Sequence, residues 1–220
     1  MLAIGAHPDD VEFGCGATLA KWADAGSVVH LLVLTDGSKG SWDPQVDSME
    51  LAETRSHEQQ RAAEALGIAA VHSLALVDGE LVAGPVEQAA VCRVIRETRP
   101  TVILGHDPWH RYRLHPDHEV AGRLTISGIV AARDPHFFRE QGLKTHRPET
   151  LLLFEAEVVD HRESIGDWND RKLAALACHE SQWRSTMGIV AGSAEFDEQR
   201  ARFEASLRRD VEEFKRIDEL

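Results

Sequence analysis

The chain has 220 residues, a formal net charge of −13 at pH 7 and 43% hydrophobic residues. This length suits one globular domain, which we expect to span residues 1–220. The negative charge would repel a phosphate backbone, so nucleic acid is not expected as a partner. The longest apolar runs fall far short of the ~20 residues that a membrane-spanning helix needs, so no membrane span is expected.

The cysteines and the amino terminus indicate the compartment. Cys15, Cys92 and Cys178 are odd in number and widely spaced, which argues against a disulfide framework and suits a reducing environment. Met1 opens directly into a strand-like run, without the basic and long apolar regions of a secretory signal. We therefore expect a cytoplasmic location.

Strand and helix patterns alternate along most of the chain. Strands are expected over 1–6, Val28–Thr35, Val71–Val77, Thr101–Gly105 and Leu151–Ala156. Helices are expected over 14–20 with an end before Gly26, over Asp47–Leu66 with Gly67 as the stop, over 86–98, and from His115 onward. This alternation predicts a Rossmann-like α/β fold, with a mainly parallel sheet and helices on both faces.

Two further helices are predicted near the carboxyl end. Asp170–Gln182 has helical composition. An apolar stripe with steps of three, four and seven residues predicts a final amphipathic helix through Phe196, Phe203, Leu207, Val211, Phe214 and Ile217. That helix is expected to cover either the core or a neighbouring subunit. The sequence therefore fits a monomer as well as a symmetric homo-oligomer.

The most informative motif is His7-Pro8-Asp9-Asp10, which directly follows the first strand. A second motif, His115-Pro116-Asp117-His118, places two imidazoles three positions apart at the start of a helix. Ligand sites of open α/β sheets form at the carboxyl ends of the strands. Both motifs, together with Asp36 and Asp78, are expected to converge there.

Two histidines and one carboxylate satisfy the ligand count of catalytic zinc and leave a position for water. A free carboxylate beside that water would act as the base. Spacing alone does not decide which of Asp9 and Asp10 takes which role. The same donor set describes the facial triad of non-haem iron oxygenases, so an iron enzyme is an alternative.

These motifs, in this order, resemble the LmbE-like, or PIG-L-type, N-acetylglucosaminyl deacetylases. The similarity extends over Ala6–Glu12, Thr35–Gly37, Arg55–Glu58 through Ala65–Gly67, Asp78–Gly79, His115–His118 and Arg171–Gln182. The resemblance implies removal of an acetyl group from an N-acetylglucosamine unit of a larger glycoside. A small N-acetylated sugar conjugate is then the expected partner, and Zn²⁺ the expected cofactor, with Fe²⁺ as the other ion that the donors allow.

The resemblance also implies roles for individual residues. It assigns zinc binding to His7, Asp10 and His118, general-base catalysis to Asp9, oxyanion stabilisation or amine protonation to His115, and orientation of a histidine to Asp117. A further alternative is a metal- or sugar-binding module that has the same fold but no catalytic activity. The intact Asp9 and His115 argue against it.

Substrate contacts are expected from Arg55 and Asp78 by resemblance, and from Arg113. The segment Trp109–Arg113 is interpreted equally well as a substrate wall or as a packed surface loop. Some relatives carry a tyrosine two positions before the first histidine of the second motif, where this chain has Arg113. His179, within the family-like segment, is expected either near the mouth of the site or as an exposed helix residue.

Overall fold

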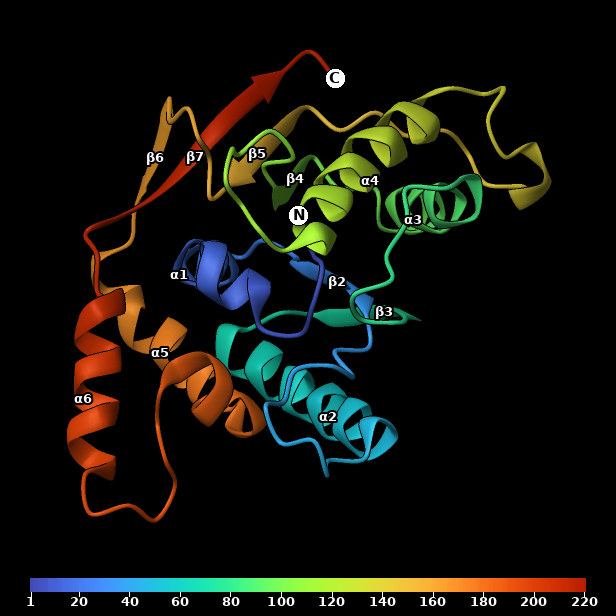
Figure 1. Cartoon of the computed structure of the whole chain (residues 1–220). Coiled ribbons are helices and arrows are strands. Elements are labelled where there is room, and N and C mark those ends of the chain that lie inside the picture. The colour runs from blue at the N-terminus through green and yellow to red at the C-terminus, as the bar shows by residue number, and fades with distance from the viewer.

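The computed structural model describes residues 1–220 and contains one seven-stranded sheet in the order β3-β2-β1-β4-β5-β7-β6 (Figure 1). The strands are β1 Leu2–Gly5, β2 His30–Thr35, β3 Ala70–Leu76, β4 Val102–His106, β5 Thr150–Phe154, β6 His161–Ser164 and β7 Val211–Asp218. β3, β2, β1, β4 and β5 pair in parallel, whereas β7 is antiparallel to both β5 and β6. The predicted mainly parallel α/β fold is confirmed.

Helices cover both faces of this sheet, with α3 and α4 on one face and α1, α2 and α5 on the other (Figure 1). Their bounds are α1 Asp10–Asp24, α2 Ser48–Leu66, α3 Pro85–Thr98, α4 Pro116–Arg133, α5 Asn169–Ala177 and α6 Phe196–Leu207. Side chains alternate along each strand, so Leu2 and Ile4 belong to the core under α3 and α4, whereas Ala3 belongs to the core under α1. Both faces are therefore buried, as in other parallel sheets.

The strand order reverses direction at β1, which positions the site. From β1 the chain first adds β2 and β3 on one side, and then β4 and β5 on the other. The crossovers diverge at this point, which opens a crevice at the carboxyl ends of β1 and β4. His7 follows β1, and the loop after β4 leads to His115 at the start of α4, so both motifs lie at this crevice.

Local residues set the helix ends and the close packing that the sequence predicted. Asp47 caps α2 by accepting a hydrogen bond from Met49 N at 2.8 Å, and Gly67 ends that helix with φ 78°. Gly14 lies where α1 packs on β5, since a Cβ there would be 2.5 Å from Phe154 Cδ2. The glycine is therefore required by packing.

α1 is kinked one turn beyond the first motif, at Cys15, whose φ is −152°. The carboxylate of Glu212 on β7 accepts hydrogen bonds from the free N–H groups of Ala17 and Thr18, at 3.2 and 2.8 Å. Glu212 also pairs with the buried Lys172 of α5 at 2.7 Å. A buried ion pair therefore caps the second part of α1.

The predicted final helix is wrong over its second half. α6 ends at Leu207, and the residues from Val211 to Asp218 form β7. Phe214 packs fully buried opposite Phe154 in the antiparallel pair of β7 and β5. The apolar steps of the sequence fit a helix, but pairing with β5 on one side and β6 on the other outweighs that local preference.

The predicted helix over Asp170–Gln182 is also shorter than expected. α5 ends at Ala177, the chain turns at Cys178 and His179, and a single 3₁₀ turn follows over Glu180–Gln182. This turn directs His179 into the interior, where it is fully buried. None of the helices combines the length and the apolar character needed to cross a membrane.

Candidate metal and catalytic site

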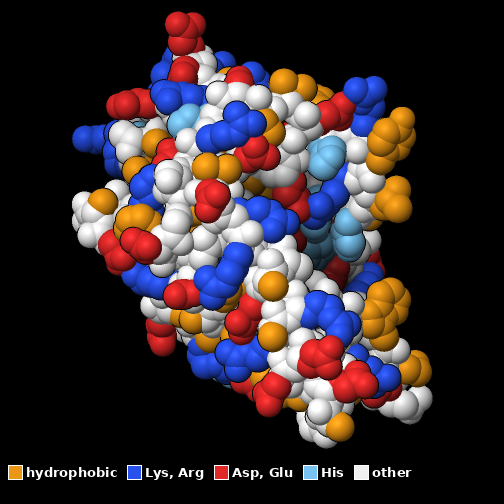
Figure 2. Space-filling view, turned by 90° about the vertical axis from the view of Figure 1, so that its left-hand side faces the viewer, with side chains coloured by type: hydrophobic (Ala, Val, Ile, Leu, Met, Phe, Trp, Pro, Cys, Tyr) orange, Lys and Arg blue, Asp and Glu red, His pale blue; other side chains and the backbone are white.

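Histidine side chains gather in a hollow on one side of the molecule (Figure 2). A cavity of about 610 Å³ is lined by 18 residues from the loops after β1, β2, β3, β4 and β5, from helices α1, α2 and α4, and from the segment after α5. Only two of them are apolar, namely Phe13 and Trp42. The cavity therefore suits a polar ligand.

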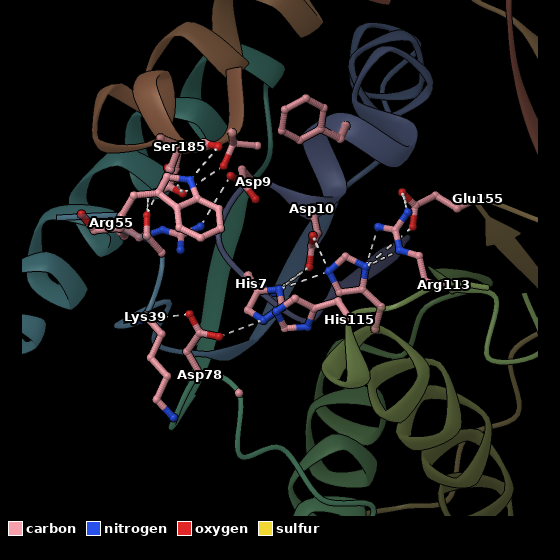
Figure 3. Close-up of a pocket in the computed structure, with 18 residues that line it drawn as sticks. His7, Asp9, Asp10, Lys39, Arg55, Asp78, Arg113, His115, Glu155 and Ser185 are labelled. Carbon is pink, nitrogen blue, oxygen red and sulfur yellow. Dashed lines mark hydrogen bonds and ion pairs between the residues drawn. The ribbon is translucent and has the colours of Figure 1, made fainter. Parts of the chain in front are cut away.

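The side chains of His7 and Asp10 point toward one another in this cavity (Figure 3). With His118 they belong to two overlapping groups of donors that could hold an ion, namely His7, His115 and His118, and Asp10, His106 and His118. His7 Nδ1 lies 3.3 Å from His118 Nε2 and 3.2 Å from Asp10 Oδ2. Asp10 Oδ1 lies 3.2 Å from His118 Nε2. The structure brings together the three residues predicted as metal ligands.

The second ring nitrogen of His7 is held by two buried carboxylates. His7 Nε2 lies 3.1 Å from Asp117 Oδ2 and 3.2 Å from Asp78 Oδ1, and Asp117 also accepts a hydrogen bond from Gly79 N at 2.7 Å. Burial would lower the pKa of His7, but the charge of Asp10 and the hydrogen bonds to all three carboxylates raise it to about 12. The negative field that produces this shift also attracts a cation. Asp117 therefore contacts a histidine of the first motif, and its role in orienting that ring stays a prediction.

His106, which was expected to follow the fourth strand at this rim but was given no role, contacts Asp10. His106 Nε2 lies 3.2 Å from Asp10 Oδ2, and its Nδ1 lies 3.3 Å from Glu155 Oε2. Burial would raise the pKa of Asp10, but the imidazoles around it hold that pKa well below its usual value. The available signal was position, since His106 directly follows the predicted strand Thr101–Gly105 and Glu155 lies at the end of the next strand.

Asp9 has a backbone conformation that is uncommon for a non-glycine residue, with φ 98°. Its N–H donates to Gln59 Oε1 at 3.1 Å, and the Arg55 guanidinium lies 3.5 Å from its carboxylate. Arg55 is 3% exposed and also donates to Pro8 O and Gly37 O. Burial raises the pKa of Asp9 to about 6, against the opposing charge of Arg55. The contacts of Arg55 therefore stabilise the turn that carries Asp9.

A buried polar network lies behind Asp9. Gln59 Nε2 donates to Glu12 Oε1 at 2.6 Å, and His179 Nε2 lies 3.9 Å from the same oxygen. Neither ring nitrogen of His179 has a hydrogen-bond partner. Burial would lower the pKa of His179, but the Glu12 carboxylate raises it. His179 is thus an interior neighbour of Asp9, and the alternative of an exposed helix residue is wrong.

His115 is exposed at the start of α4 and leans on the cluster. Its ring centroid lies 4.5 Å from that of His7 and 5.0 Å from that of His118. Burial and the charges of these two rings lower the pKa of His115. The side chain therefore lines the cavity beside the donor atoms without any hydrogen bond that would tie it down.

Arg113 is the one member of the Trp109–Arg113 segment that lines the cavity. Its Nε and Nη2 lie 2.8 and 2.5 Å from His118 Nδ1, and its Nη1 lies 2.7 Å from Glu155 Oε1. Trp109 and Tyr112 are exposed outside the cavity. The surface-loop interpretation therefore holds for most of this segment, whereas Arg113 belongs to the site.

The fold and this cluster define an α/β protein with a histidine and carboxylate metal-type site at the switch point of its sheet. The chain belongs to the PIG-L family, described as GlcNAc-PI de-N-acetylase, whose family model matches residues 2–129. Both histidine motifs lie within the matched residues.

Individual relatives agree with this assignment. The chain is 38% identical over 186 residues to a diacetylchitobiose deacetylase of Thermococcus kodakarensis, covering 83% of this chain and 70% of that protein. It is 34% identical over 163 residues to a 1D-myo-inositol 2-acetamido-2-deoxy-alpha-D-glucopyranoside deacetylase of Kineococcus radiotolerans, of which it covers only 45%. The solved structure of an N,N'-diacetylchitobiose deacetylase from Pyrococcus horikoshii superposes with a TM-score of 0.87 at 26% identity, over 99% of this chain and 83% of that one.

Proposed function

We propose that this protein is a metal-dependent N-deacetylase that hydrolyses the acetamide of an N-acetylglucosamine-type glycoside. The pairwise contacts among His7, Asp10 and His118, in which each oxygen of Asp10 lies next to one histidine, support this function most directly, together with the Asp9 carboxyl in the same cavity. The named deacetylases among the relatives support the substrate class.

The donor set fits a zinc ion. Ligands about 2.0–2.2 Å from a tetrahedral ion lie roughly 3.3–3.6 Å from one another. The contacts among His7, Asp10 and His118 are 3.2–3.3 Å, which is close to that spacing. Imidazole nitrogen and carboxylate oxygen are standard zinc ligands, although ferrous iron accepts the same set.

Metal binding has a consequence for the partners of His118. Ligation through Nε2 leaves the ring proton on Nδ1, which then needs an acceptor. Arg113 carries only donors, whereas Glu155 Oε2 lies 3.9 Å from Nδ1 and can accept. We therefore assign Glu155 as the carboxylate that orients His118 in the metal-loaded protein, with Arg113 free to contact substrate.

Asp9, His115, Asp78 and Asp117 have separate roles in amide hydrolysis. A divalent ion, when bound, lowers the pKa of water and polarises a carbonyl. Asp9, with its pKa raised toward neutrality, accepts a proton from the attacking water. His115 donates to the developing oxyanion or to the departing amine. Asp78 and Asp117 hold His7 in place.

Acetate release from N-acetylglucosaminides, with and without a chelator, tests this function. Asp9→Asn should keep its metal, because Asp10 is the ligand, yet lose turnover by about 10²-fold or more. Asp47→Asn is the control, since asparagine caps helix α2 as well as aspartate does. Full turnover in Asp9→Asn would refute the role of base. Equal rates with and without oxygen are expected, because hydrolysis needs no oxidant.

A further inference from the structure

Trp42 is an aromatic side chain that lines the cavity although 80% of its surface is exposed. Its indole N–H donates to Ser185 O at 3.2 Å. The neighbouring Gly40 O accepts from Gln182 Nε2 at 3.1 Å and from Ser185 Oγ at 3.2 Å. Three hydrogen bonds therefore fix the loop that carries Trp42 to the segment after α5. The indole is held in one position while most of its surface faces solvent.

This wall is separate from the wall that holds Arg113 and Glu155. Ser185 lies on the same side of His7 as Arg55 and Asp9, whereas Arg113 and Glu155 lie on the other side (Figure 3). The cavity of about 610 Å³ is in the middle of the range of ~300–1,000 Å³ that is typical of pockets for drug-sized ligands. Room therefore remains beyond the ring whose acetyl group reaches the donor cluster.

We propose that Trp42 is the stacking platform for a second sugar ring, next to the N-acetylated ring that faces His7, Asp10 and His118. A pyranose ring has an apolar face of C–H groups that packs on an indole. Its hydroxyls can form hydrogen bonds with the hydroxyls of Ser185 and Thr186, which line the same wall. An aromatic side chain that is already immobilised loses little entropy when a ring stacks on it. The substrate class is then a glycoside of at least two rings. This inference rests on the proposed deacetylase function.

Trp109 provides a matched control. It is also an exposed tryptophan on a loop near the site, with 58% of its surface exposed, but it does not line the cavity. We expect Trp42→Ala to raise KM for N,N'-diacetylchitobiose about 3- to 10-fold, the equivalent of one aromatic contact, with little change in kcat. KM for N-acetylglucosamine should not change. Trp42→Phe should restore most of the loss, and Trp109→Ala should leave both substrates unaffected.

Calorimetric binding of mono-N-acetylchitobiose and of glucosamine, the products of one deacetylation of each substrate, separates this inference from the proposed function. Trp42→Ala should weaken binding of mono-N-acetylchitobiose by the same factor relative to glucosamine. If the wild type released no acetate from either substrate, the deacetylase function would fail, while the binding measurement would still decide the role of Trp42. Equal effects of Trp42→Ala on one-ring and two-ring ligands, or no effect on either, would overturn the platform.

Discussion

The buried pair of Glu212 and Lys172 gives a sharp test of how the carboxyl-terminal strand supports the site helix. Glu212→Gln keeps the shape but leaves the Lys172 ammonium without a counter-charge, at side-chain exposures of 7% for Lys172 and 5% for Glu212. The amide also offers only one oxygen, where Ala17 N and Thr18 N both need an acceptor. Breaking a buried pair in this way costs about 3–5 kcal/mol. At ~2–4 °C per kcal/mol for a chain of this size, Tm should fall by roughly 6–20 °C.

Glu213→Gln is the matched control one residue further along β7. Glu213 pairs with Arg162 at 2.8 Å, with side-chain exposures of 48% and 61%, so its loss should cost less than about 1 kcal/mol. The free energies of unfolding are measured by urea titration of both variants with metal present. A difference of less than about 1 kcal/mol between the two variants would refute the assigned cap of α1.

Three further predictions concern metal and pH. Zinc at 100 times its Kd should raise the free energy of unfolding by about 2.7 kcal/mol, and thermal unfolding with and without zinc should show no such gain in His118→Ala. Glu155→Gln should weaken zinc binding by about 10- to 100-fold in a chelator competition, and unchanged affinity would remove its assigned role. Burial and the neighbouring His72 lower the pKa of His30, so the folded state disfavours its protonation. Stability should therefore fall as pH drops from about 6.5 toward the folded pKa, and a His30→Asn variant with the same slope would contradict this.

The sheet and the donor cluster were predictable because their signals are local. Each buried strand is a short apolar run, and the residues that follow it must lie at the same edge of a parallel sheet. His7 and His118 are more than a hundred residues apart in sequence, yet both follow from this rule. Arg55, Asp78 and Arg113 also line the predicted cavity, while their contact with substrate stays a prediction.

Other parts of the site depend on contacts that no local pattern encodes. β7 has the apolar spacing of a helix, and only its pairing with β5 and β6 makes it a strand. His179 is buried because α5 breaks after Ala177, which composition alone did not indicate. Glu155 looks like any polar residue after a strand, and its position beside His106 emerges only in the folded chain.

Diffraction from zinc-loaded crystals at the zinc absorption edge measures the metal position most directly. We expect one ion with His7 Nδ1, Asp10 and His118 Nε2 as its protein ligands, and with His7 Nε2 still held by Asp117 and Asp78. Those two carboxylates form, with His7, another group of donors that could hold an ion. An anomalous peak among His7, Asp78 and Asp117 instead, or no ordered ion in the cavity, would contradict the proposed metal centre.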